Sequence, residues 1–334
     1  MPFEIVPVGT NIDFLSQRRI CISISIGLIL LGAIFALPSV KGINVGLDFA
    51  GGTEVQLLFD EGVVVDESMI REVVAGAGFD EPNVVRFGDN DVNEFMIKFK
   101  AAGGNAVPEG GERDGLEANT QVIELENAIK GAIGGFTEQR VEYVGPRVGA
   151  ELREDGAKAL LYSAIMILAY VTFRFNSRFA PGAVVAVVHD LAITAGILIM
   201  MGEEFDLRIL AAMLAILGYS LNDTIIIYDR IRENMELRTT ADLEEVLNAS
   251  VNQTLSRTFL TSITTMIALL SLYFLGGNVI QSFAKTMLIG VVVGTYSSVF
   301  IASPLLLFLE TRYGNADGKK SAKKGPGVNK AARV

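Results

Sequence analysis

Six apolar stretches dominate the pattern of hydrophobic and polar positions along this chain. A helix that crosses a bilayer needs about 20 residues, and the six stretches approach or reach that length. They lie at residues 20–37, 157–173, 182–201, 207–228, 259–275 and 287–309. The pattern therefore predicts a polytopic α-helical membrane protein with six transmembrane helices.

The segment between the first two predicted spans has a different pattern, made of short strands and helices. It predicts strands at 53–59, 83–87, 94–99 and 138–144, and helices at 66–77 and 116–133. The order β-α-β-β-α-β is that of a ferredoxin-like α+β domain. Its sequence holds no pairing of a nucleophile with a base and no metal-ligand cluster, which favours a docking module over a catalyst.

The predicted elements divide the chain into successive parts. A cytoplasmic segment at 1–19 precedes the first transmembrane helix at 20–40, and the α+β domain occupies 41–156. The other five spans form a membrane region at 157–313, which includes an amphipathic segment at 229–256 expected on the membrane surface or against the bundle. A basic tail follows at 314–334, and attraction to anionic membrane lipid is the default role of such a tail.

Charge is distributed unevenly along the chain. Residues 42–156 hold 23 acidic and 9 basic residues, whereas the rest of the chain holds 15 acidic and 19 basic residues. Basic residues cluster before the first span, after the second, after the fourth and after the sixth. The positive-inside rule therefore predicts that both termini are cytoplasmic and that the α+β domain is external. The acidic balance of that domain argues against nucleic acid as a partner.

The cysteine count limits the available chemistry. Cys21 is the single cysteine of the chain, so no intrachain disulfide and no multi-cysteine metal site can form. Its place at the start of an apolar run is typical of a buried, inert thiol. We expect neither a cofactor nor a metal ion.

Polar residues interrupt two of the predicted spans. His189 and Asp190 lie in the third span, and Asn222, Asp223 and Thr224 lie in the fourth. A charged residue at mid-span costs roughly 2.5–3.5 kcal/mol on insertion scales, and such residues usually mark an ion path or a partnered network. At 1.5 Å of rise per residue, the expected depths of the two aspartates differ by only about 5 Å. This places both in one candidate proton site.

The fifth and sixth spans add further polar and small residues. Thr258, Thr261, Ser262 and Thr265 fall on one helical face of the fifth span, after Arg257 at its cytoplasmic start. Arg257 is near enough to the membrane edge to reach toward Asp223. Gly290 and Gly294 form a small-xxx-small pattern in the sixth span, which predicts close helix packing and a candidate contact for a partner subunit.

Each of these residues also has a structural interpretation. Asp223 can be a neutral carboxyl bonded to neighbouring helices, and Asp190 can hold the third and fourth spans together. Arg257 can be an ordinary positive-inside anchor. The hydroxyl stripe and the glycine pair fit packing better than a proton path.

Several motifs together resemble the SecF family of the resistance–nodulation–division superfamily. Gly218–Thr224 is the most specific, and it includes Ser220, Asn222, Asp223 and Thr224. The other matching motifs are Gly46–Thr53, Val144–Gly149, Asp229–Asn234, Thr254–Thr258 and Thr286–Gly290. The resemblance covers the whole chain except the basic tail, and the short external domain favours SecF over SecD.

The resemblance implies a function and assigns roles to individual residues. Proteins of this family pair with SecD, join the SecYEG channel and use the proton gradient to export unfolded polypeptides across the cell (inner) membrane. The family's functional aspartate corresponds to Asp223 and its membrane arginine to Arg257. His189 and Asp190 also fit a family pattern, and Asn222, Thr224, Ser220 and Thr261 are expected as supporting polar residues.

Three other functions compete with this one. A small-molecule or lipid exporter of the same superfamily usually needs two six-span halves with large porter domains. An intramembrane aspartyl protease would use Asp190 and Asp223 on adjacent spans, but the Gly-x-Gly-Asp motif of that family is missing. The third is a purely structural scaffold whose partner carries the proton chemistry.

Overall fold

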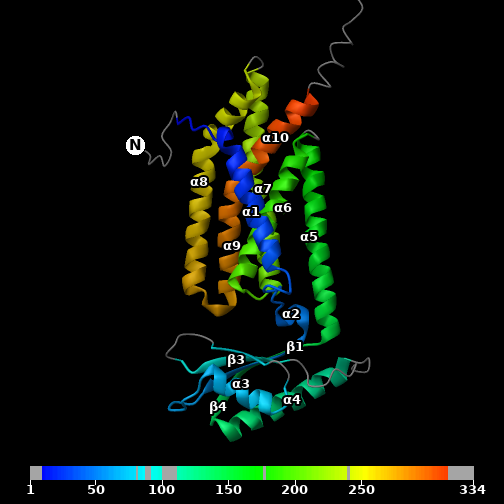
Figure 1. Cartoon of the computed structure of the whole chain (residues 1–334), viewed down its shortest axis with the longest axis vertical. Coiled ribbons are helices and arrows are strands. Elements are labelled where there is room, and N and C mark those ends of the chain that lie inside the picture. The colour runs from blue at the N-terminus through cyan, green and yellow to red at the C-terminus, as the bar shows by residue number, and fades with distance from the viewer. Residues whose placement is uncertain are drawn as a thin grey trace, which may run out of the picture.

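Six helices in the described part of the chain are long and apolar enough to cross a membrane. The structure is a computed structural model that describes residues 10–79, 82–86, 92–99, 111–175, 178–238 and 241–314. The first five spans contain the helices α1 (Arg18–Phe35), α5 (Pro146–Arg174), α6 (Ala180–Met201), α7 (Leu207–Leu237) and α8 (Leu243–Leu275). The fold is thus the expected polytopic helical bundle with a small α+β domain (Figure 1).

The sixth span is made of three consecutive pieces instead of one regular helix. It comprises α9 (Gly277–Ser297), the π-helical turn η2 (Ser298–Ala302) and α10 (Ser303–Leu309). Pro304 occupies the first turn of α10, where its missing N–H is tolerated. Because π turns widen a helix locally, η2 changes the direction of side chains at the height of Ser297 and Ser298.

Three of the spans form the centre of the bundle. The apolar windows of α6 and α7 are each 50% buried and that of the sixth span is 56% buried, whereas those of α1 and α5 are 11% buried and that of α8 is 17% buried. Most of the apolar surface of α1, α5 and α8 therefore faces outward, toward lipid or other proteins.

The segment at 229–256 does not form a separate amphipathic helix. α7 continues to Leu237 and α8 already begins at Leu243, with Asp242 as its N-cap residue. Helical periodicity runs unbroken across the expected membrane edge, so the apolar side chains of this segment pack between the two helix ends. Val246, Leu247 and Val251 are buried there.

The α+β domain has the predicted ferredoxin-like order. It contains β1 (Gly52–Phe59), α3 (Glu67–Gly76), β2 (Asn83–Arg86), β3 (Glu94–Phe99), α4 (Gly111–Ala132) and β4 (Phe136–Val144). The strands form one antiparallel sheet in the order β2-β3-β1-β4. α4 begins five residues before the predicted helix at 116–133, because its first turn carries no apolar periodicity that would show it.

Alternation along the strands puts one face of the sheet against the two helices. Val55, Leu57 and Phe59 of β1 are buried, and they share a core with residues of α3 and α4. Asp66 caps α3 by accepting a hydrogen bond from the Met69 N–H at 2.8 Å. We call this unit, residues 52–144, the sheet domain.

A pair of glycines joins the first span to the sheet domain. Gly51 and Gly52 follow the short helix α2 (Leu47–Ala50) and have φ angles of 74° and 139°. A Cβ on Gly51 would lie 2.8 Å from Pro146 Cα at the start of α5. Only glycine accepts both this conformation and this close approach.

The sheet domain is attached to the loop between α6 and α7. In that loop, Phe205 exchanges backbone hydrogen bonds of 2.8 Å with Asn44 and with Gly46. Glu204 of the same loop is ion-paired with Lys98 of β3. Figure 1 shows the sheet domain at the end of the bundle opposite α10.

Candidate functional site in the membrane bundle

Asp190 on α6 is the centre of a buried hydrogen-bond network. It is fully buried, and its Oδ1 lies 2.8 Å from His189 Nδ1. Its Oδ2 accepts hydrogen bonds from the hydroxyls of Ser220 on α7 and Ser297 on α9, the latter at 2.8 Å. One carboxylate thus joins the three central spans, and both of its oxygens are satisfied.

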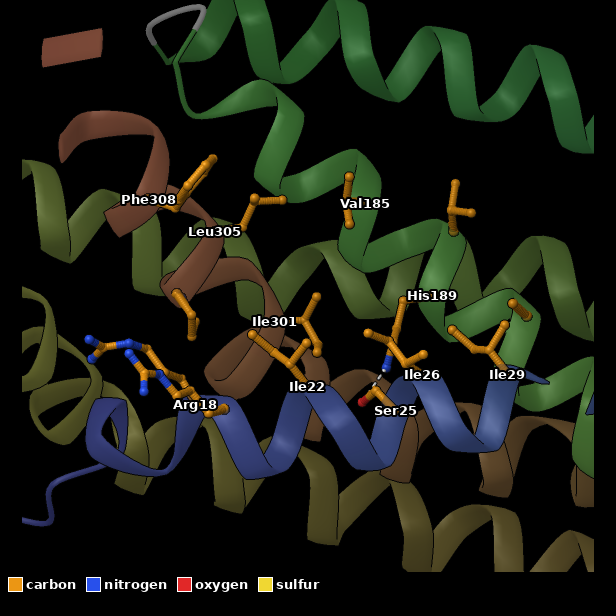
Figure 2. Close-up of a pocket in the computed structure, with 14 residues that line it drawn as sticks. Arg18, Ile22, Ser25, Ile26, Ile29, Val185, His189, Ile301, Leu305 and Phe308 are labelled. Atoms are coloured by element: carbon orange, nitrogen blue, oxygen red, sulfur yellow. Dashed lines mark hydrogen bonds between the residues drawn. The ribbon is translucent and has the colours of Figure 1, made fainter. Parts of the chain in front are cut away.

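The network continues through His189 to the first span. His189 Nε2 lies 2.9 Å from the Ser25 hydroxyl on α1, as Figure 2 shows. The Ser25 hydroxyl lies 3.2 Å from the Tyr296 hydroxyl on α9, which donates to the Cys21 carbonyl at 2.8 Å. Polar groups of four spans are therefore connected in one chain.

Asp223 on α7 has a contrasting environment. Its exposed fraction is 1%, and neither carboxylate oxygen has a hydrogen-bond partner among the described residues. Thr258 of α8 is also buried, and its hydroxyl likewise has no partner there. Buried polar groups without partners are rare, and an ionisable residue inside a membrane span is a candidate functional position.

Arg257 lies on α8 directly before Thr258. It does not hydrogen-bond to Asp223, whose two carboxylate oxygens have no partner among the described residues. Arg257 lines a cavity of about 370 Å³ together with Asp229, Arg230 and Gln253 at the end of the bundle distant from the sheet domain. The structure therefore shows no direct contact between Arg257 and Asp223.

The supporting polar residues occupy different surroundings. Thr224 is buried and its hydroxyl lies 3.1 Å from that of Ser298 on the π turn. Thr261 donates to the carbonyls of Arg257 and Thr258 within α8. Asn222 is exposed on the outer side of α7 and does not join the network. Of the four, only Ser220 contacts an aspartate directly.

Gly290 and Gly294 pack against α7 within the chain. A Cβ on Gly290 would lie 2.2 Å from Ile216 Cδ1, and a Cβ on Gly294 would lie 3.1 Å from Ser220 Cβ. This contact brings α9 close enough for Ser297 to reach Asp190. The expectation that the glycine pair contacts a partner subunit is wrong, because α7 already covers it.

The sequence did not reveal Ser25, Tyr296 and Ser297 as members of the network. Ser23 and Ser25 alternate with isoleucines in the first span, and only Ser25 is buried. Serine and tyrosine occur often in spans, so their spacing does not indicate a partner. Their role depends on which helices are neighbours.

The two aspartates do not form a catalytic dyad. An aspartyl protease needs two carboxyl groups that share a proton. Here Asp190 uses both oxygens for His189 and two serines, and no hydrogen bond joins it to Asp223. The described residues also contain no group of three or more side chains suited to a metal ion.

These features define a class: a multi-pass membrane protein with a buried acidic site in its bundle, of the kind that marks ion or proton paths. The profile of the family "Protein export membrane protein SecD/SecF, C-terminal" matches residues 124–312, and the "SecD/SecF GG Motif" matches residues 37–63, which include Gly51 and Gly52. The chain is 38% identical to the protein translocase subunit SecF of Desulfurispirillum indicum, over 94% of this chain and 96% of the relative. It is also 40% identical to the protein translocase subunit SecF of Escherichia coli O157:H7, over 90% of this chain and 88% of the relative.

The chain belongs to the SecF family of protein export membrane proteins. Its fold resembles the crystal structure of SecDF, a translocon-associated membrane protein from Thermus thermophilus, with a TM-score of 0.78 and 34% identity. A second SecDF crystal structure, in a super-membrane-facing form, matches with a TM-score of 0.66 and 35% identity. The chain spans 40% of the length of each of these SecDF chains.

Proposed function

We propose that this protein works with a SecD-like subunit and uses the proton motive force to promote export of unfolded polypeptides through a SecYEG channel. Membership of the SecF family supports the export role. The basic residues in the links after the second and fourth spans support an orientation with both termini in the cytoplasm and the sheet domain outside the inner membrane. In that orientation the sheet domain meets the emerging polypeptide.

The contrast between the two buried aspartates carries the proposal. Asp190 has fixed partners, which suits a structural role. Asp223 has none, and an ionised carboxylate buried without hydrogen bonds is costly. Proton binding and release at Asp223 therefore require its surroundings to change, which is the coupling that a proton-driven motor needs.

Arg257 supplies one such change. If it moved closer to Asp223, its guanidinium would stabilise the ionised carboxylate and favour proton release. Its withdrawal would favour the neutral form and proton uptake. One proton falling through 100 mV releases about 2.3 kcal/mol, which shifts a conformational equilibrium roughly fiftyfold.

A continuous mechanical path links Asp223 to the sheet domain. Asp223 lies about 24 Å along α7 from Leu207, at 1.5 Å per residue. The loop immediately before α7 contains Glu204, which is ion-paired with Lys98 of β3. It also contains Phe205, whose backbone is hydrogen-bonded to the segment before α2. A displacement of α7 therefore acts directly on the sheet domain.

The position of Asn222 supports a partner subunit. Its amide is exposed on the bundle surface within the fourth span. An amide facing lipid has no hydrogen-bond partner, so such residues are usually covered by another helix. The family implies a SecD-like partner, and we assign that partner to this face.

The proposal is tested by export into inverted membrane vesicles with an imposed proton gradient. Asp223→Asn keeps the size of the side chain but removes the titrating group, so we expect normal insertion and no stimulation of export by the gradient. Asp229→Asn, on the same helix but in exposed ion pairs, is the matched control. Gradient-dependent export at the wild-type rate in the Asp223→Asn vesicles would refute the proton role of this residue.

A further inference from the structure

An apolar groove runs along the outside of the bundle between α1, α6 and α10. Its volume is about 600 Å³, and Ile22, Ile26 and Ile29 of α1 form one wall. Val185 of α6 and Phe308 of α10 lie on the other side, as Figure 2 shows. Val188 of α6 also lines the groove. This volume lies in the range of about 300–1,000 Å³ that is usual for small-molecule sites.

Charge is concentrated at one end of the groove. Arg18 and Arg19, at the start of α1, are the two charged residues that line it. Arg18 is ion-paired with Glu244 of α8. Arg19 is exposed, and its guanidinium has no ion pair within the described ranges of the chain. The mouth of the groove therefore offers positive charge to an anionic group.

The length of the groove matches one leaflet of a bilayer. From Arg19 to Ile29 is ten residues of helix, or about 15 Å at 1.5 Å per residue. The hydrocarbon core of a bilayer is about 30 Å thick, so the groove extends from one membrane surface to about the midplane. A transmembrane helix of another protein would need a surface about twice as long.

We propose that this groove binds one acyl chain of an anionic phospholipid, with the lipid phosphate held at Arg19 and Arg18. Arginine binds phosphate through paired N–H donors, and the apolar walls accommodate the hydrocarbon. The proposal rests on the shape and charge of this groove and is independent of the proton role of Asp223.

The bound chain would also cover the Asp190 network. His189 and Ser25 form part of the groove floor, about 9 Å along α1 from Arg19. An acyl chain in the groove passes over the hydrogen bond between them. The bound acyl chain thus covers the polar network and excludes water from that network.

The test is native mass spectrometry of the purified full chain with phosphatidylglycerol or phosphatidylcholine of identical acyl chains. Arg18 is already paired with Glu244, so Arg19 supplies the uncompensated charge. One arginine near a membrane surface favours an anionic lipid by about fivefold, so the wild type should prefer phosphatidylglycerol by at least about that factor. Arg19→Gln should remove most of this preference, and Arg18→Gln/Arg19→Gln should remove what remains. Retention of phosphatidylcholine should not change in either.

A second variant tests the groove and leaves the arginines intact. Val188→Phe places a large side chain on the exposed wall of α6, so both lipids should be lost. The control for the arginine variants is Arg174→Gln/Arg230→Gln, which removes two basic residues at the same end of the bundle. The control for Val188→Phe is Ile267→Phe, on the exposed face of α8. Equal lipid loss in the controls would show only non-specific attraction, and unchanged retention in Val188→Phe would show that the groove is not the lipid site. Either result overturns the proposal, as would a partner's helix cross-linked to position 188.

Discussion

The Ser220 hydroxyl on α7 donates a hydrogen bond to the Asp190 carboxylate on α6, one turn before Asp223 on the same helix. This bond ties the helix that carries the unpartnered aspartate to the helix that carries the satisfied one. A rotation or shift of α7 at Asp223 therefore changes the geometry at Asp190. The two aspartates are coupled without touching.

The different environments of the two aspartates predict different effects on stability. Asp190→Leu leaves His189 Nδ1 and the Ser220 hydroxyl without a partner, and Ser297 keeps only the Gly294 carbonyl, so we expect a loss of about 1–3 kcal/mol or more in the free energy of unfolding. Asp223→Leu removes no hydrogen bond, so we expect no loss. Equilibrium unfolding of both variants in the same detergent measures this. A loss in Asp223→Leu as large as that in Asp190→Leu would show that Asp223 has a structural partner.

Arg257→Lys separates an electrostatic role from simple anchoring. Both residues satisfy the positive-inside rule, so insertion should be normal. A lysine lacks the planar fork that can bind a carboxylate through two donors, so we expect a smaller increase of export with the proton gradient. The measurement is the export rate against the imposed gradient at matched abundance, with Arg230→Lys as control. A wild-type slope for Arg257→Lys would assign Arg257 to anchoring alone.

Close packing of α1 on α6 predicts a strong effect at Gly32. A Cβ there would lie 2.7 Å from Gly196 Cα, a backbone atom that cannot move aside. Gly32→Ala should therefore cost about 1–3 kcal/mol and lengthen the contact between Ser25 and His189.

Gly27→Ala on the same helix is the matched control for this prediction. A Cβ at Gly27 has no neighbour within 4 Å, so the Gly27→Ala substitution should be neutral or slightly stabilising through helix propensity. Thermal unfolding of the two variants in detergent distinguishes them. Equal melting temperatures would mean that α1 and α6 are not packed this closely.

Glu54 in the sheet domain predicts a pH dependence of local stability. Burial raises the pKa of Glu54 above its ordinary value, Lys98 opposes the rise, and the negative charge of Glu142 adds to it. Because the folded state binds this proton more tightly, the stabilising contribution is complete below the unfolded-state pKa. It is lost as the pH rises through the folded-state pKa.

Glu54→Gln removes this titration. The variant should match the wild type near about pH 4 and protect the sheet-domain amides better than the wild type near about pH 7. Hydrogen exchange of the full chain, as a ratio of variant to wild type, measures the difference. Glu72→Gln, exposed on α3, is the control. A ratio for Glu54→Gln that does not change with pH would show that Glu54 is not the source of the pH dependence.

The number of spans and the order of the sheet domain followed from local pattern. Six apolar runs of this length are typical of transmembrane helices, and the alternation in β1 and β3 favours one buried face. The same pattern predicted a buried carboxylate at Asp223, and the structure confirms its burial.

Helix boundaries beyond the membrane were less predictable. Helical periodicity does not change at the membrane surface, so α7 and α8 extend past the edge at which hydropathy ended the predicted spans. The sequence signal for the break in the sixth span is Pro304, which cannot donate an N–H within a continuous helix. The residues of the π turn itself are compatible with a regular helix, so they do not show where the break lies.

Only the tertiary structure distinguished Asp190 from Asp223. The sequence placed both at similar depths on successive spans and left each with a functional and a structural interpretation. The difference comes from His189, which neighbours Asp190 on α6, and from the hydroxyls of Ser220 and Ser297. Both serines reach Asp190 in a region where Gly294 lets α9 approach α7 closely. Composition and local periodicity determine which segments enter the membrane. The contacts between helices, which depend on the close approach of distant residues, determine which buried carboxylate is satisfied and which is not.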